Sequence, residues 1–201
     1  VVLAWQIGWA PADSMPRQMF NYIKKYHDTP SNLIYALSGA PYFSEPLPEE
    51  CTSIDVIHEG MIESSDHNVT GKKQYIQAAL DWNLKGGAIC YEGGPHHRGQ
   101  VFDNLETRMA AHRHEKMQEI LVRDLQKNWF DLGGGLFCYY SATGGYSQYG
   151  CWALSEDVND LNTPKYKAIK QLYDEDKKYS EVNPSYVANT PAPSYADGKA
   201  L

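Results

Sequence analysis

The chain has 201 residues, of which 42% are hydrophobic and 21% charged, and its formal net charge at pH 7 is −7. This length and composition predict a globular chain with a core of its own. An acidic surface repels nucleic-acid phosphates and anionic lipid headgroups, which argues against nucleic acid and membrane surfaces as partners. No apolar run reaches about 18 residues, so no transmembrane helix is expected.

Short apolar segments alternate with helical patterns along the chain. The expected strands are residues 1–7, 32–37, 86–91 and 136–140, and the expected helices are about 14–27, 52–63, 72–84, 104–130 and 164–179. Glycine runs directly follow two of these helices, at 86–87 and 133–135. Parallel strands need helical crossovers, so this alternation predicts an α/β fold with a parallel sheet.

The two ends of the chain differ in character. The first strand begins at Val1 with no preceding turn, so we expect the natural polypeptide to extend upstream. Residues 183–201 contain Pro184, Pro191 and Pro193 among Ser, Ala and Asn, which is typical of a linker or tail. We therefore expect residues 1–182 to be the C-terminal part of a folded domain and residues 183–201 to be a tail or linker.

Cysteines and a glycosylation signal bear on the cellular compartment. The four cysteines permit three complete disulfide pairings, and Asn68-Val-Thr70 is an N-glycosylation sequon. Together they favour a secreted, extracellular protein with disulfides. The alternative is that cysteines in apolar strands are free core residues. The disulfide candidates are Cys51, Cys90, Cys138 and Cys151.

Polar and aromatic residues gather where the expected strands end. In parallel α/β folds, chemistry collects at the carboxyl ends of the strands. Glu92 follows an apolar strand directly and precedes two glycines, which leave room for a ligand near the backbone. The alternative is that Glu92 caps the next helix or pairs with an arginine. The other residues at strand ends include Gln6, Trp9, Tyr42, His96 and Tyr140.

The segment around Glu92 resembles a known family. Tyr91-Glu-Gly-Gly-Pro-His96 is similar to the Tyr-Glu-Gly-Gly-Gln-His segment of secreted bacterial proteins built on a glycoside hydrolase clan A barrel, described as cellulose-binding or glycosidase-like. The resemblance covers residues 1–173 and implies a (β/α)₈ TIM barrel, of which this chain supplies strands five to eight with their helices. Its further matching segments are residues 40–43, 129–137, 149–154 and 164–166.

The resemblance also implies roles for single residues. Glu92 would end strand seven, where retaining enzymes of that clan keep their nucleophile. Tyr42 would hydrogen-bond this carboxylate, which lowers the pKa of a carboxyl group. His96 would contact a sugar hydroxyl or the same carboxylate. The remaining expected substrate contacts are Gln6 and the aromatic residues Trp9, Tyr140 and Trp152, for each of which a core role is the alternative.

Two functions remain open. The first is retaining hydrolysis of a β-linked extracellular polysaccharide, which needs two carboxylates about 5–5.5 Å apart. In the clan, the acid/base Glu follows an Asn, and no Asn-Glu pair occurs in these residues. The acid/base would therefore lie in a missing N-terminal half, on the same polypeptide or on a separate chain. The second is a non-catalytic secreted glycoprotein, a scaffold, matrix or carbohydrate-binding component that kept the barrel.

The sequence predicts neither a cofactor nor a metal site. It contains no phosphate-binding loop and no dinucleotide-binding glycine turn. His112 and His114 would point to different faces of their helix, and no Cys or His pair has zinc-finger spacing.

Overall fold

The computed structural model describes residues 1–7, 14–99 and 101–182, and over these ranges the fold is α/β. Four parallel strands form one sheet in the same order as in the chain, and two short parallel strands form a second sheet. The first sheet contains β1 (Val2–Ala4), β2 (Ala36–Gly39), β4 (Ala88–Gly93) and β6 (Phe137–Tyr139), and the second contains β3 (Phe43–Ser44) and β5 (Pro95–His96). The predicted parallel sheet is thus confirmed.

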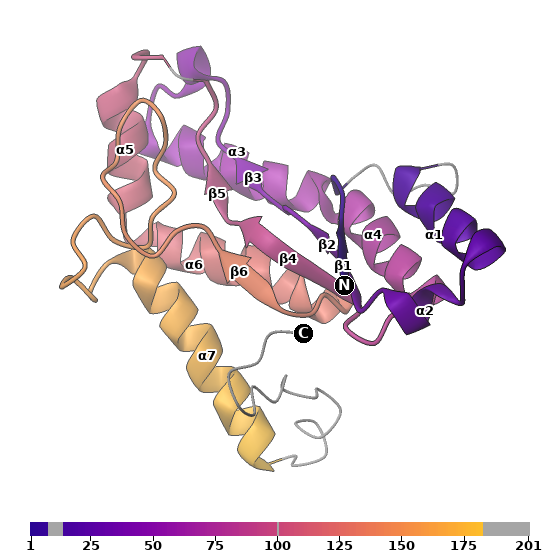
Figure 1. The fold of residues 1–201 in the computed structure, drawn as a ribbon. Coiled ribbons are helices and arrows are strands. Elements are labelled where there is room, and N and C mark those ends of the chain that lie inside the picture. The colour runs from indigo at the N-terminus through magenta and orange to yellow at the C-terminus, as the bar shows by residue number, and fades with distance from the viewer. Residues whose placement is uncertain (8–13, 100, 183–201) are drawn as a thin grey trace.

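Helices occupy each connection between the strands of the larger sheet (Figure 1). They are α1 (Met15–Tyr26), α2 (Pro30–Leu33), α3 (Ile54–His67), α4 (Val69–Asp81), α5 (Leu105–Arg113), α6 (Lys116–Val122) and α7 (Pro164–Val182). Short 3₁₀ turns cover Pro48–Glu50 and Phe130–Leu132, and a π-helical turn covers Arg123–Lys127. Among residues 1–7, 14–99 and 101–182, no helix is long and apolar enough to cross a membrane.

Three boundaries differ from the sequence prediction. The strand expected at 32–37 begins only at Ala36, because Pro30 starts the short helix α2. The helix expected over 104–130 is interrupted, since His114 has an extended backbone between α5 and α6. The gap expected between the helices at 52–63 and 72–84 is instead a helix junction, at which Asn68 ends α3 and begins α4. Local patterning located these elements but not their exact ends.

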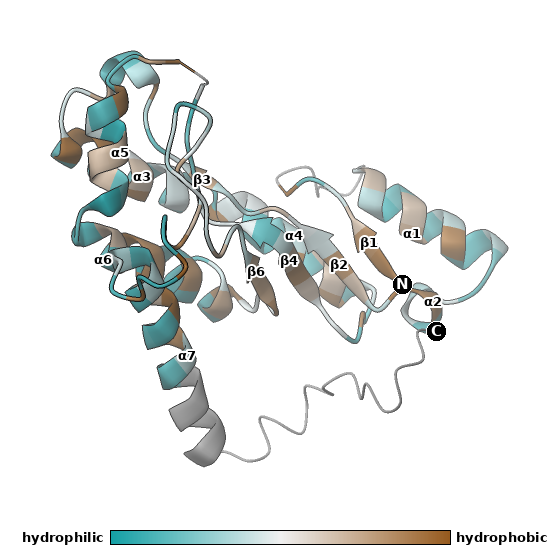
Figure 2. Cartoon of the chain, turned by 60° about the vertical axis from the view of Figure 1, so that its left-hand side comes forward, coloured by the Kyte–Doolittle hydropathy of each residue, from teal (hydrophilic) through white to brown (hydrophobic). Residues whose placement is uncertain are grey.

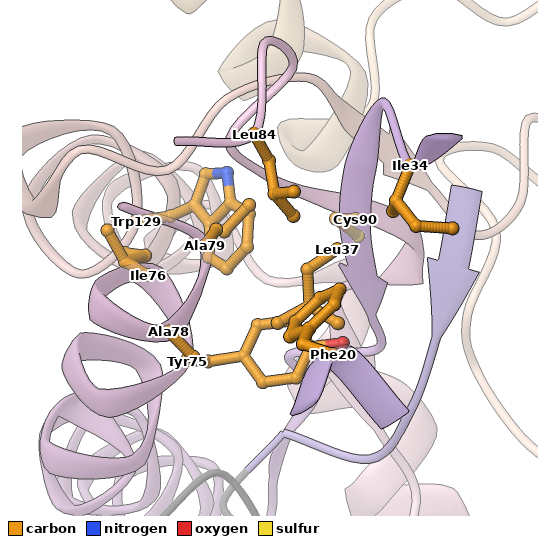
Figure 3. Close-up of a cluster of buried hydrophobic side chains, with 11 residues drawn as sticks. Phe20, Ile34, Leu37, Tyr75, Ile76, Ala78, Ala79, Leu84, Cys90 and Trp129 are labelled. Carbon is orange, nitrogen blue, oxygen red and sulfur yellow. The ribbon is translucent and has the colours of Figure 1, made fainter. Parts of the chain in front are cut away.

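One apolar cluster lies between the larger sheet and the helices (Figure 3). Tyr75 of α4 is fully buried there, and its hydroxyl donates to the carbonyls of Trp5 and Ser38 at 3.0 and 2.6 Å. This side chain therefore ties α4 to the ends of both β1 and β2. The buried members are Phe20, Ile34, Leu37, Tyr75, Ile76, Ala78, Ala79, Leu84, Ala88, Cys90 and Trp129.

The two faces of the larger sheet differ in what they contact. Leu37 and Phe137 point to the helices and join the apolar cluster. On the opposite face, Val2 is 46%, Tyr91 49% and Leu136 67% exposed. Figure 2 shows hydrophobic colouring along β1, the strand that contains Val2. We call the face with Val2, Tyr91 and Leu136 the open face, and its apolar character is unusual for a sheet surface in contact with water.

A β-bulge near the end of β4 decides where Glu92 points. Cys90 pairs with Phe137 and Gly93 with Tyr139, so three steps along β4 match two along β6. A Cβ atom on Gly93 would lie 2.6 Å from Phe137 Cζ and 3.1 Å from Cys90 Sγ, which places this position on the helix side. We infer that its neighbour Glu92 points to the open face. Regular alternation from Cys90 would have turned it towards the helices.

Because the bulge leaves no room at Gly93, we expect Gly93→Ala to lower the free energy of unfolding by about 1–3 kcal/mol, the usual cost of overpacking. Gly145→Ala is the matched control, because a Cβ there meets nothing within 4 Å. Urea denaturation of both variants measures the difference. Equal midpoints for the two would show that the bulge does not depend on the glycine.

The structure joins none of the four cysteines in a disulfide. Cys51, Cys90 and Cys151 are buried and Cys138 is exposed, and burial raises the pKa of each buried thiol to about 12. Although Cys90 and Cys138 lie on neighbouring strands, Cys90 faces the helices and Cys138 does not. The predicted disulfides are therefore not formed, and Cys90 is the core residue of the alternative interpretation.

Candidate functional site

The carboxyl ends of β2, β4 and β6 bring together several of the predicted site residues. Tyr42 follows β2, and His96 lies in β5. The pairing of β3 with β5 matches Ser44 to His96, and the Tyr42 and His96 rings lie 5.6 Å apart between centroids. This small sheet was not predicted, because two-residue strands have no readable sequence period. It is the element that places Tyr42 beside His96.

Two more aromatic residues complete the group. The Trp152 ring stacks on His96 at 6.3 Å between centroids with an interplanar angle of 28°. Tyr140, just after β6, meets Trp152 edge-on at 5.9 Å. Tyr140 is 43% exposed, and the other three side chains are half-buried. We call Tyr42, His96, Tyr140 and Trp152 the aromatic cluster, whose partly exposed rings present flat apolar surfaces and polar edges to solvent.

The protonation of His96 follows from its contacts. Burial lowers the pKa of His96, and the charge of Arg98 lowers it further, so the ring is neutral at pH 7. Trp152 Nε1 donates to His96 Nδ1 at 3.4 Å. Because Nδ1 accepts this hydrogen bond, the proton of the neutral ring resides on Nε2. His96 can therefore offer an N–H donor to a ligand.

The negative charge of Glu92 acts on the phenol of Tyr42. Burial raises the pKa of the Tyr42 phenol above its ordinary value of 10.0, and the negative charge of Glu92 raises it further. Tyr42 therefore keeps its proton at neutral pH and can donate a hydrogen bond. The structure gives no hydrogen bond between the Tyr42 hydroxyl and Glu92, so the predicted positioning contact stays a prediction. Glu92 itself is half-buried at the end of β4.

Asn68 has a structural contact that its sequon does not suggest. Its side-chain Nδ2, the atom that would carry an N-glycan, donates to the Tyr42 carbonyl at 3.1 Å. With Tyr42, Pro41 and Lys72, this residue also lines a surface hollow between the end of β2 and the start of α4. Asn68 thus holds the segment that carries Tyr42. Glycosylation at this position stays a prediction.

Two predicted site residues are not joined to the aromatic cluster. Gln6 is exposed after β1, and the described structure gives it no contact with these rings. Trp9 lies outside the residues that the structure describes. A role in ligand binding for either residue stays a prediction.

A second group of polar residues lies buried next to the aromatic cluster, and sequence reasoning missed it. Glu45, His97, Arg108, His112 and Lys165 are each no more than 3% exposed. One ligand atom each of His97, His112 and Cys151 lie within 4.8 Å of one another. His97, His112 and Cys151 come from three separate segments of the chain. Helix periodicity and motif spacing therefore could not reveal the group. The signals in the sequence were the adjacent histidines His96 and His97, and His112, which was considered as a metal ligand together with His114 and rejected.

Comparison of the chain with protein-family models, with curated proteins and with solved structures finds no match.

Proposed function

We propose that this chain is the C-terminal half of a glycosidase-type (β/α)₈ barrel, supplying strands five to eight. Four parallel strands in chain order, each followed by helices, support this arrangement. The open face supports it as well, because the inner face of such a barrel is filled by side chains from all eight strands. The exposed Val2, Tyr91 and Leu136 would then pack against strands of the other half.

The proposed activity is retaining hydrolysis of a β-linked extracellular polysaccharide. Glu92 attacks the anomeric carbon and forms a glycosyl-enzyme, while an acid in the other half protonates the leaving oxygen. Water, deprotonated by that same group, then releases the sugar and frees Glu92. Tyr42 donates to the carboxylate in the complex and keeps it oriented. The substrate and the upstream half of the barrel are thus the two partners of this chain, and the protein is secreted.

One observation carries the proposal: the bulge turns Glu92 to the open face, at the edge of the sheet where the aromatic cluster lies. A nucleophile must reach the substrate from a strand end, and a pyranose ring presents apolar C–H faces that stack on aromatic rings. His96 Nε2–H and the Tyr42 hydroxyl are donors beside these rings, as sugar hydroxyls require.

The alternative function is carbohydrate binding without hydrolysis. The aromatic cluster by itself could hold a sugar, and binding needs no second carboxylate. A barrel that has lost its acid/base residue would keep this surface as a lectin-like or matrix component.

Labelling with 2-deoxy-2-fluoro β-glycosides tests the proposal, because the fluorine slows hydrolysis of the glycosyl-enzyme. We expect the full-length polypeptide to gain the mass of one sugar, and peptide mapping to locate it on Glu92. Sugar binding without a covalent adduct would support the non-catalytic alternative. An adduct on another carboxylate, or no binding across a panel of β-glycosides, would exclude the proposed role of Glu92.

A further inference from the structure

Beside the aromatic cluster lies a group of buried polar atoms that have no hydrogen-bond partner. They are five atoms, Glu45 Oε2 and both ring nitrogens of His97 and of His112. The exposed fractions are 1% for Glu45, 3% for His97 and 0% for His112. An unpaired buried polar atom costs about 1–3 kcal/mol, so five together require a compensating partner.

The distances between these atoms do not fit direct hydrogen bonds. Glu45 Oε2 lies 3.6 Å from His97 Nδ1 and 3.7 Å from His112 Nε2, beyond the range of a normal hydrogen bond. The third side chain is Cys151, which is fully buried, and one ligand atom each of Cys151, His97 and His112 lie within 4.8 Å of one another. Two imidazoles and a thiol thus surround one point in the interior.

We propose that His97, His112 and Cys151 bind a zinc ion whose fourth ligand is a water molecule, with Glu45 as the carboxylate that orients the two histidines. Imidazole nitrogen and thiolate sulfur are the ligands that zinc prefers, at about 2.0–2.3 Å. These bond lengths place neighbouring ligand atoms about 3.3–3.8 Å apart in a tetrahedron, so ligand atoms that lie within 4.8 Å of one another need to approach by at most about 1.5 Å.

Glu45 lies where it can hydrogen-bond the two histidine ligands without binding the ion itself. Histidines that bind metal usually donate their other ring N–H to a carboxylate, which selects the tautomer. Glu45 Oε2 faces one ring nitrogen of each histidine, and the second nitrogen of each ring is then free for the ion. The other oxygen, Oε1, accepts from Arg108 Nε at 2.7 Å and from the Arg98 backbone N–H at 3.1 Å, which holds the carboxylate in place.

The surrounding charges allow a cation here. The Cys151 thiolate and the Glu45 carboxylate together offset the double charge of zinc. Two basic side chains also lie nearby. Arg108 is paired with Glu45 and also donates to the backbone carbonyls of residues 98, 101 and 103. Lys165 donates to the Cys151 carbonyl and lies 4.5 Å from the centre of the Tyr146 ring. Arg108 is thus held by Glu45 and by backbone carbonyls, and Lys165 by the backbone carbonyl of Cys151 rather than by its thiol.

The ion would be structural and would stabilise the neighbouring site. His97 follows His96 directly, and Cys151 precedes Trp152, while His112 lies on α5. One zinc would therefore join the two loops that carry His96 and Trp152 to a helix. This role does not depend on whether the aromatic cluster binds a sugar.

Metal analysis of the full-length polypeptide tests the inference. After dialysis against metal-free buffer, we expect about one zinc per chain, and we expect Cys151→Ser and His112→Asn to lose it. Cys138→Ser is the matched control, because Cys138 is exposed and lies outside the group; it should keep the metal. Zinc retained by both ligand variants, or no more than trace metal in the unsubstituted protein even with added zinc, would overturn the proposal.

Cobalt substitution gives a readout that does not depend on the folding of variants. In the unsubstituted protein, Co²⁺ should produce a thiolate-to-cobalt charge-transfer band together with the intense visible bands of a tetrahedral ion. Removal of the metal by a chelator should lower the melting temperature, and added zinc should restore it. Octahedral cobalt spectra without a thiolate band would contradict the assigned ligands.

Discussion

Replacing Glu92 with glutamine is expected to reduce kcat for a β-linked glycan by at least about a thousandfold, as removal of a covalent nucleophile does in other enzymes. Glutamine keeps the size of the side chain but cannot form the glycosyl-enzyme. Since the Glu92 side chain is only half-buried and its carboxylate makes no hydrogen bond with the residues that the structure describes, the variant should retain the melting temperature of the parent protein. The loss would therefore report chemistry rather than folding.

Two comparisons sharpen this test. Glu63→Gln changes the same residue type at an exposed position on α3 and should leave kcat unaltered. Glu92→Ala leaves space for a small anion, and azide should then restore turnover with formation of an α-glycosyl azide. Unchanged activity of Glu92→Gln would remove the nucleophile assignment. Full loss without azide rescue would instead indicate an indirect effect on substrate binding.

Replacing Asp124 with alanine is expected to lower the free energy of unfolding by about 3–5 kcal/mol, the cost of breaking a buried ion pair. Asp124 is 0% exposed, and its Oδ1 accepts from Lys72 Nζ at 2.7 Å and from Ser65 Oγ at 2.6 Å. Asn128 Nδ2 donates to the same Ser65 hydroxyl at 2.8 Å. The variant would leave the Lys72 ammonium, which is also fully buried, without its counter-charge.

The expected loss depends on burial, which a matched substitution can show. Asp81→Ala removes the carboxylate of an exposed pair with Arg17 (2.9 Å) and should cost no more than about 1 kcal/mol. The double variant Lys72→Met with Asp124→Leu removes both buried charges and should recover most of the stability lost in Asp124→Ala. Urea denaturation measures all three. Equal losses of unfolding free energy for Asp81→Ala and Asp124→Ala would show that the buried pair stabilises the fold no more than the exposed pair does.

Local patterning was sufficient for the general architecture. Glycines after two helices and short apolar runs between them placed β4 and β6 within a few residues. The same reasoning could not find β3 and β5, because pairs of residues such as Phe43–Ser44 form strands only when a partner lies beside them. It also missed the break at His114. The apolar residues keep their helical spacing across this position, but the backbone of His114 is extended and ends α5.

The position of Glu92 at a strand end came from the sequence by itself, whereas its direction came only from the tertiary structure. The strand Ala88–Gly93 and the following glycines are local features. The bulge depends on pairing with β6, some 45 residues later in the chain, and it reverses the face that simple alternation assigns to Glu92. Which face a side chain adopts near a bulge is a property of the strand pair, not of one strand.

The buried group around Glu45 shows the same limit more strongly. Its proposed ligands His97, His112 and Cys151 belong to β5's loop, to α5 and to the loop after β6. Spacing rules for metal sites detect ligands that share one turn or one helix, and these share neither. The sequence determined which elements form and which residues end the strands. Packing among distant segments decided which of those residues meet, because such contacts have no local period to read.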